Sequence, residues 1–233
     1  MSEAVLQFSD APVARATMHR TRVVIIDDHP IVRRGLAELV ASMHDMEMVG
    51  EAESYARALE MLQNTPTDVA IVDLSLDDSS GLDLLSEIRS RFPSVKSIVF
   101  SIHDAELYAP RALRAGAAGF VSKTQPCEDL LTAIRTLSEG EIYVAPDVAQ
   151  RILRRMSSGG RARADGGVEL LSDRELQVFE LVGRGQTTGE IARALHLSPK
   201  TVETHRQRIK AKLGIDSGTK LLIRAAQWVA QDT

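Results

Sequence analysis

One short segment of this chain reads Asp68-Val69-Ala70-Ile71-Val72-Asp73-Leu74. The run between the two aspartates is apolar and mostly β-branched, which is typical of a strand buried on both faces of a parallel sheet between helices. Asp73 then stands at the carboxyl end of this strand, and in open α/β sheets ligands bind at that edge. A single acid in this position is more often a helix cap or a loop residue. The other strands of the sheet therefore have to be considered with it.

Three further strand-like runs also end in polar side chains. The groups that follow them are Asp27 and Asp28 after residues 23–26, Ser101 after 98–100, and Lys123 after 119–121. If all four strands are parallel, then three carboxylates, a hydroxyl and an ammonium converge at one edge of the sheet. Taken one by one, the aspartates and Ser101 are also explained as caps of the following helices, and Lys123 as a surface lysine.

Clustered carboxylates need a cation. Three of them repel one another and raise each other's pKa unless a positive charge joins them. A hard divalent ion with oxygen ligands, Mg²⁺ by default, removes the conflict and leaves coordination sites for water and a phosphate oxygen. Lys123 and the Ser101 hydroxyl are then available to the other phosphate oxygens. Because positioning and charge neutralisation dominate the catalysis of phosphoryl transfer, the residues predict such a site with Asp73 as nucleophile.

In this order, Asp27-Asp28, Asp73, Ser101, Phe120 and Lys123 resemble the receiver domain of two-component response regulators, over roughly residues 21 to 140. The resemblance implies that Asp73 accepts a phosphoryl group from the histidine of a sensor kinase. It also implies that Mg²⁺ is held by Asp27, Asp28, Asp73 and the backbone carbonyl of Ser75. Only self-phosphorylation and slow loss of phosphate are implied, so the chain is not expected to be a turnover enzyme.

The same resemblance assigns roles around the phosphoryl group. Lys123 pairs with it, Ser101 moves toward it, and Phe120 swings into the space that Ser101 leaves. Without the motif, Phe120 is simply a core aromatic. The chain departs from the family at Asp77-Asp78, where a Pro-Gly pair is common, and at Thr124, where a proline is common.

Strand and helix patterns alternate five times between Arg22 and about Gly140. Helices are expected near residues 30–43, 54–63, 81–92, 104–115 and 127–138. This alternation implies βαβ units with right-handed crossovers. The predicted fold is α/β, a five-stranded doubly wound parallel sheet of the flavodoxin-like type, followed by a small all-α helix-turn-helix domain.

The composition divides the chain into four parts. Residues 1–20 show no periodicity and are expected to be a disordered tail, and residues 21–145 form the receiver. Residues 146–168 contain one more helix and a flexible linker, since positions 157–167 hold four glycines among small polar residues. Residues 169–233 are expected to form the small all-α helix-turn-helix domain.

Composition and charge set the class of protein. With 233 residues, 44% hydrophobic and 26% charged, the chain is a soluble globular protein, and no run approaches the roughly 18 apolar residues of a membrane span. Residues 1–150 carry 13 lysines and arginines against 23 acids, whereas residues 151–233 carry 15 against 9. This asymmetry suggests that the first part handles a cation and the second an anion such as nucleic acid. A single cysteine, Cys127, fits a reducing cytosol.

The last part of the chain is helical by pattern. Ser172-Asp173-Arg174-Glu175 is a capping box that opens a first helix. Thr188 is expected to cap a short second helix. After a tight turn, Ser198 caps a third helix with Pro199 at its first position.

This third helix is polar and basic on its outer face. Val202, Ile209 and Leu213 share the inner face, and His205 is expected to lie in the core. The outer face carries Lys200, Glu203, Thr204, Gln207 and Ala211. Two helices of this kind form a helix-turn-helix whose second helix can enter the major groove, although a solvated charged face on a small bundle has the same pattern.

The exact sequence decides between these two interpretations. The strings 171–175, 190–192, 198–205 and 212–214 resemble the LuxR-type output domain over about residues 168 to 230, so the whole chain resembles the NarL/FixJ class. By position, the resemblance implies base contacts from Glu203, Thr204 and Gln207, and phosphate contacts from Lys200, Thr201, Arg206 and Lys210. The acidic Glu203 either accepts from a cytosine amino group or pairs with a neighbouring arginine, and the sequence leaves both open.

We therefore expect a cytoplasmic, phosphorylation-controlled transcription regulator. Phosphate on Asp73 is expected to shift a two-state equilibrium toward a form that frees the basic domain and favours a homodimer. The implied partners are a sensor histidine kinase, double-stranded promoter DNA and RNA polymerase, with no membrane. The alternatives are a phosphate sink and a DNA-binding regulator that works without phosphorylation.

Overall fold

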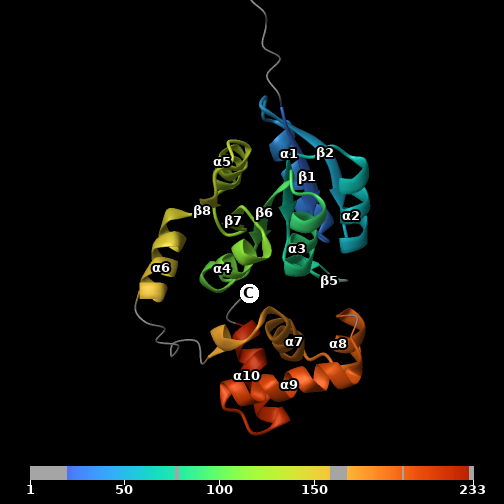
Figure 1. Ribbon diagram of the computed structural model, residues 1–233, viewed down its shortest axis with the longest axis vertical. Helices are drawn as coiled ribbons and strands as arrows, with labels where there is room; N and C mark the ends of the chain where they lie inside the picture. The colour runs from blue at the N-terminus through green and yellow to red at the C-terminus, as the bar shows by residue number, and fades with distance from the viewer. Residues whose placement is uncertain (1–19, 77–78, 158–166, 196, 231–233) are drawn as a thin grey trace, which may run out of the picture.

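The computed structural model describes residues 20–76, 79–157, 167–195 and 197–230 (Figure 1). The expected disordered tail, most of the expected linker, Asp77-Asp78 and His196 lie outside these residues. Within the described part of the chain, no helix is long and apolar enough to cross a membrane.

The first unit alternates strands and helices as expected. Its main elements are β1 (Thr21–Ile26), α1 (Pro30–Ala41), β2 (Met46–Ala52), α2 (Tyr55–Asn64), β3 (Val69–Val72), α3 (Gly81–Arg91), β6 (Lys96–Ser101), α4 (Ala105–Ala115), β7 (Gly119–Ser122) and α5 (Cys127–Ser138). Two short elements after β3, β4 (Ser75–Leu76) and β5 (Ser79–Ser80), pair antiparallel. The five expected helices begin and end within two residues of their predicted bounds.

The sheet has six parallel strands in the order β2-β1-β3-β6-β7-β8. This is one strand more than predicted, because β8 (Tyr143–Val144) adds an edge beside β7, pairing Gly119 with Tyr143 and Phe120 with Val144. Two residues are too short to give a periodic signal, so the sequence could not reveal β8. The doubly wound class is confirmed.

Two apolar clusters sandwich the sheet. Alternate residues of the strands face opposite sides: Val23 and Ile25 belong to the cluster under α1 and α5, whereas Val24 and Ile26 belong to the cluster under α2, α3 and α4. All four side chains are fully buried, as a strand covered on both faces requires. The sheet is therefore a rigid platform whose carboxyl edge holds the loops that follow β1, β3, β6 and β7.

The second unit is helical and contains the expected helix-turn-helix. After α6 (Pro146–Ser157) and a 3-10 turn at Val168–Leu170, the helices are α7 (Asp173–Gly183), α8 (Thr188–Ala194), α9 (Pro199–Leu213) and α10 (Gly218–Val229). The Ser172–Glu175 capping box is present, and Ser198 caps α9 with Pro199 at its start. The prediction for α8 was wrong by one residue: Thr187 is the cap, in a capping box with Glu190, and Thr188 is already helical.

Candidate functional site

Four strands deliver polar side chains to one edge of the sheet. Asp27 follows β1 and Asp73 follows β3, and their exposed fractions are only 2% and 3%. The two residues are held side by side by the backbone, since the Asp73 amide donates to the Ile26 carbonyl at 2.8 Å. Gly81 lets the start of α3 approach closely, because a Cβ there would lie 2.5 Å from the Asp73 carbonyl oxygen. The acidic pair is thus fixed before any ligand arrives.

Lys123 joins these two carboxylates. Its Nζ atom lies 2.8 Å from Asp27 Oδ2 and 2.7 Å from Asp73 Oδ2. The Lys123 side chain is only 12% exposed, so the alternative interpretation as a surface lysine does not fit. Although burial lowers the pKa of the Lys123 ammonium, the carboxylates of Asp73 and Asp27 outweigh burial and raise that pKa above its ordinary value. The ammonium therefore stays charged and offsets part of the negative charge of the two carboxylates.

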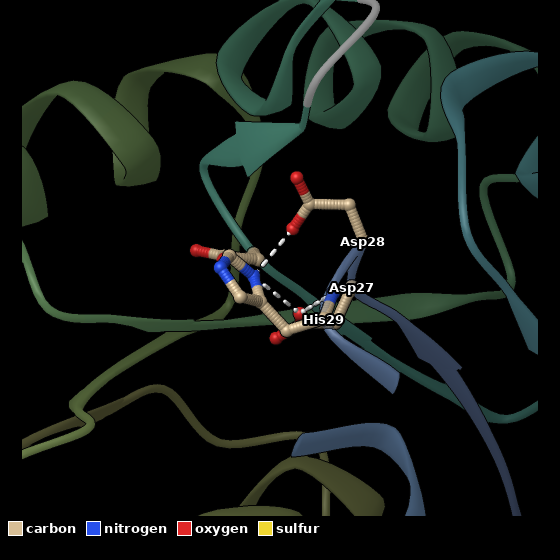
Figure 2. A group of neighbouring side chains, drawn as sticks. Asp27, Asp28 and His29 are labelled. Carbon is tan, nitrogen blue, oxygen red and sulfur yellow. Dashed lines mark hydrogen bonds and ion pairs between the residues drawn. The ribbon is translucent and has the colours of Figure 1, made fainter. Parts of the chain in front are cut away.

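The acidic group extends to the loop after Asp27. Asp27, Asp28, His29 and Asp73 each offer a possible ligand atom, and these atoms lie within 4.8 Å of one another. Figure 2 shows the His29 ring between the first two aspartates, with Nδ1 2.6 Å from Asp28 Oδ1 and 3.3 Å from Asp27 Oδ1. Oxygen donors at this spacing suit a hard divalent cation. The sequence interpretation missed His29, although its place directly after Asp27-Asp28 is a signal.

The helix-cap explanations for these residues fit less well. The N-cap of α1 is His29, without a side-chain cap bond, although Asp27 Oδ1 accepts from the His29 amide at 2.8 Å. Asp104 caps α4 by accepting from the Glu106 amide, so Ser101 is not needed for that purpose. The cluster is therefore not explained by helix ends alone.

The remaining predicted residues lie just after Asp73 and on the strands β6 and β7. The Ser75 amide donates to Asp73 Oδ1 at 3.3 Å, and Ser101 is completely buried with its hydroxyl accepting from the His103 amide at 3.4 Å. Phe120 points inward with an exposed fraction of 2%. The structure thus brings together Asp27, Asp28, Asp73 and Lys123 at one edge of the sheet, whereas Phe120 lies within the neighbouring strand β7.

The second candidate site is the outer face of α9. Lys200, Glu203, Thr204 and Gln207 are exposed, whereas Val202 and Ile209 are fully buried on the opposite side. Thr201, Arg206 and Lys210 are half-buried at the flanks. His205 is half-buried rather than deep in the core, and burial lowers the pKa of its imidazole.

Contacts within the helix-turn-helix orient this face. Arg206 donates to the Thr188 hydroxyl at 2.9 Å, which ties α9 to α8. Glu203 Oε2 lies 3.9 Å from Arg206 Nε, and the Gln207 amide donates to Glu203 Oε1 at 3.5 Å. Glu203 therefore pairs with an arginine of its own helix in this structure, which is one of the two roles left open by the sequence.

An ion pair whose acidic partner is buried fixes α9 against α7. Lys212 Nζ lies 2.6 Å from Glu175 Oε2, and the Glu175 side chain is 4% exposed. Although burial raises the pKa of Glu175, the Lys212 ammonium and hydrogen bonds from Ser172 outweigh burial and lower that pKa below its ordinary value. Glu175 thus closes the capping box of α7 and holds the C-terminal end of α9.

These two sites on one chain define a class of protein in which a doubly wound domain with an acidic pocket is followed by a helix-turn-helix domain. The sequence matches the family described as "Response regulator receiver domain" over residues 23–135 and that described as "Bacterial regulatory proteins, luxR family" over residues 169–225. The chain belongs to the transcriptional response regulators that join a receiver to a LuxR-type DNA-binding domain.

Individual relatives support the assignment over most of the chain. The transcriptional regulatory protein UhpA of Salmonella typhimurium is 38% identical over 202 residues, which cover 87% of this chain and 96% of UhpA. The structure of RcsB from Salmonella enterica serovar Typhimurium bound to the promoter rprA with the phosphomimetic BeF3⁻ has a TM-score of 0.69, 27% identity and coverage of 89% and 99%. A structure of two RcsB dimers bound to two parallel DNAs has a TM-score of 0.57, 26% identity and coverage of 92% and 100%.

Proposed function

We propose that Asp73 is the residue that accepts a phosphoryl group, from the histidine of a sensor kinase. The observation that carries the proposal is the Asp73 carboxylate itself, which is buried at the sheet edge between the Lys123 ammonium at 2.7 Å and the Ser75 amide. In the transfer, an Asp73 oxygen forms the new bond to phosphorus as the bond from phosphorus to the histidine nitrogen breaks. Lys123 stabilises the negative charge of the phosphoryl oxygens, and the fixed geometry supplies the positioning that this reaction needs.

The donor set of the pocket fits Mg²⁺. Asp27, Asp28 and Asp73 provide carboxylate oxygens, and the Ser75 backbone carbonyl is the proposed fourth ligand. When bound, Mg²⁺ neutralises charge on the phosphoryl oxygens. The carboxylates of Asp27 and Asp73 already share the Lys123 ammonium, so they are held in place to receive a second cation.

Two further residues are proposed to report the phosphorylated state. Ser101 lies fully buried beside the site, and its hydroxyl can turn toward a phosphoryl group. Phe120, on the neighbouring strand β7, fills the adjacent interior. A shift of both side chains would alter the packing of α4, which lies over β7.

We further propose that α9 reads promoter DNA from the major groove. Its exposed Glu203, Thr204 and Gln207 would meet base edges, and the phosphate contacts would come from Lys200, Thr201, Arg206 and Lys210. Exposed Leu222 and Ile223 on α10 offer an apolar surface to a second copy of the chain, so we propose a homodimer when phosphorylated. RNA polymerase is the proposed downstream partner, and the cytoplasm the proposed compartment.

Intact mass measurement tests the first proposal directly. Wild type and Asp73→Asn are incubated with Mg²⁺ and acetyl phosphate, and light scattering and DNA binding are measured on the same samples. A single phosphate adduct on wild type only, with more dimer and higher DNA affinity, is expected. An adduct without any change in DNA binding would favour a phosphate sink, and DNA binding without an adduct would favour regulation that does not use phosphorylation.

A further inference from the structure

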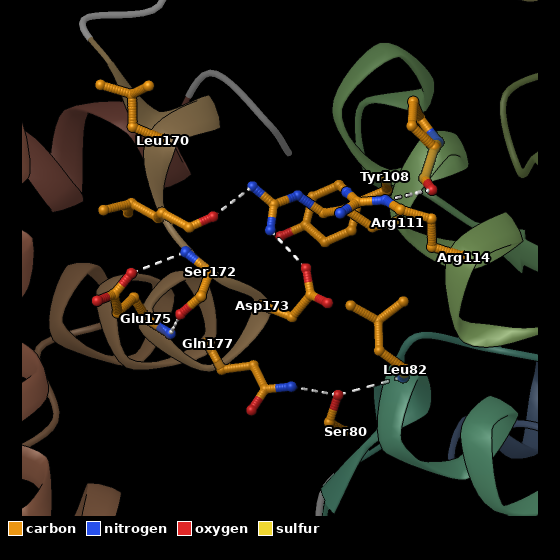
Figure 3. A network of polar contacts seen from close by, with 12 residues as sticks. Ser80, Leu82, Tyr108, Arg111, Arg114, Leu170, Ser172, Asp173, Glu175 and Gln177 are labelled. Atoms are coloured by element: carbon orange, nitrogen blue, oxygen red, sulfur yellow. Dashed lines mark hydrogen bonds and ion pairs between the residues drawn. The ribbon is translucent and has the colours of Figure 1, made fainter.

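The receiver and the DNA-binding unit meet through polar contacts between α4 and α7, which Figure 3 shows. Arg111 of α4 is only 4% exposed, and its guanidinium donates to Asp173 at 2.6 Å and to the Leu171 carbonyl at 2.8 Å. Tyr108, one turn earlier, donates its hydroxyl to Glu180. Buried charged groups that find their partners on the other unit indicate a specific docked arrangement.

The rim of this contact lies at the loop that leaves the acidic pocket. Gln177 of α7 donates to the hydroxyl of Ser80, which caps α3, and Arg174 lies 3.3 Å from Asp83. The apolar cluster under α2, α3 and α4 runs without a break into the core of the second unit. Docking therefore places α7 against the segment that connects β3 to α3, directly after Asp73.

His103 connects this contact to the pocket. Its ring stacks on Tyr108 with the centroids 4.6 Å apart, and Nδ1 lies 4.0 Å from Glu180 Oε1. On the other side, Nε2 lies 2.8 Å from the Ser75 hydroxyl, and the His103 amide donates to the Ser101 hydroxyl. The side chain is 8% exposed, so it cannot shift without disturbing its neighbours.

We propose that His103 couples the phosphoacceptor site to the docking of α7. The inference rests on the proposed phosphorylation of Asp73. A phosphoryl group on Asp73 would occupy the space beside Ser75 and attract the Ser101 hydroxyl. The hydroxyl groups of Ser75 and Ser101 are the pocket-side partners of His103. Displacing His103 removes the ring that supports Tyr108, which weakens the contact of Tyr108 with Glu180 and releases α7.

The proposed coupling acts through α7 and not by covering the DNA-reading face. Glu203, Thr204 and Gln207 of α9 stay exposed while the units are docked. Since coupling between two equilibria is reciprocal, undocking must favour phosphorylation as much as phosphorylation favours undocking. His103 is thus a positioning residue that acts through Ser75 and Ser101.

Chemical cross-linking across the rim tests the coupling. The background chain carries Cys127→Ser, Asp83→Cys and Arg174→Cys, and a short bismaleimide reports docking as an intramolecular cross-link. With acetyl phosphate and Mg²⁺, the cross-linking rate is expected to fall severalfold as the adduct appears in the intact mass. In His103→Ala the adduct is expected to form without that fall.

Two variants and a control make the outcome decisive. Tyr108→Phe keeps the ring but loses the hydrogen bond to a charged acceptor, so cross-linking without phosphodonor is expected to fall about tenfold. Ser75→Ala, which keeps the backbone carbonyl, should weaken the response to phosphodonor even if His103→Ala fails to fold. Arg57→Gln removes an exposed ion pair on α2 and should change nothing.

The same samples separate the two proposals. If His103→Ala and Ser75→Ala respond to acetyl phosphate as the background chain does, while all carry the adduct, the coupling role of His103 is wrong and the proposed phosphorylation stands. If the background chain gains no adduct, the mass alone overturns the proposed function, and the coupling with it.

Discussion

Substituting Lys123→Met removes the ammonium that bridges Asp27 and Asp73 at 2.8 and 2.7 Å. Two nearly fully buried carboxylates then face one another without that charge. Breaking a buried ion pair by removing one partner typically costs about 3–5 kcal/mol of unfolding free energy. Because the Lys123 side chain itself is 12% exposed, we expect the lower end, about 3 kcal/mol, in the presence of EDTA.

Urea unfolding measures this loss, and two signals separate the units. Far-UV circular dichroism follows both units, whereas the fluorescence of Trp228, the single tryptophan, follows the second unit, where it packs on Phe179. The loss of unfolding free energy should appear in the unfolding transition of the receiver, which circular dichroism detects and Trp228 fluorescence does not. Mg²⁺ should restore part of this free energy, because a divalent ion replaces the missing positive charge.

Lys96→Met, an exposed lysine at the start of β6, serves as the control and should be nearly neutral. A loss below about 1 kcal/mol for Lys123→Met in EDTA, the size expected of an exposed pair, would refute the reasoning. So would a loss that Mg²⁺ leaves unchanged.

Three other expectations concern the second unit. Ser172→Ala removes the capping-box hydroxyl, so the Trp228 transition should lose about 1 kcal/mol; an unchanged urea midpoint would contradict the cap's contribution. Burial lowers the pKa of His205, so the folded state favours the neutral ring. The neutral His205 ring therefore contributes fully to stability above about pH 6.5, and this contribution is lost on acidification. Urea titrations at several pH values test this: between pH 7 and roughly 5, the unfolding free energy of His205→Asn should fall less than that of wild type. Lys200→Ala should weaken DNA binding on all sequences and reduce the slope of log affinity against log salt by about 1; a loss confined to one DNA sequence would instead indicate a base contact.

Local signals made much of the fold predictable. The buried strand β3 and the capping box at Ser172 depend on neighbouring residues, and both are as the sequence indicated. The cap of α8 was placed one residue late because two threonines stand together, and only the backbone geometry decides between Thr187 and Thr188. The strand β8 was missed because a two-residue strand has no period.

Asp27, Asp73 and Lys123 were predictable because each directly follows a strand that ends at the same edge of the sheet. The docking residues were not, since nothing near Arg111 or Tyr108 in the sequence indicates a partner 62 or 72 positions away. His103 has no signal either: it lies two residues after Ser101 in an ordinary loop, and its proposed role rests only on what the fold places around it. Such pairings are set by tertiary packing, which a local pattern does not contain.

The segment Leu171–Glu175 has a consequence for protein engineering. This segment accepts hydrogen bonds from Arg111 of the receiver, and its Glu175 forms an ion pair with Lys212 of α9. The two units are therefore not freely interchangeable modules. A chimera that fuses this receiver to another LuxR-type domain would keep Arg111 buried but lose Asp173 as its partner, unless the new domain supplies an acid there. A chimera made at this junction should keep the docked arrangement only when it retains both Arg111 and an acid at the position of Asp173.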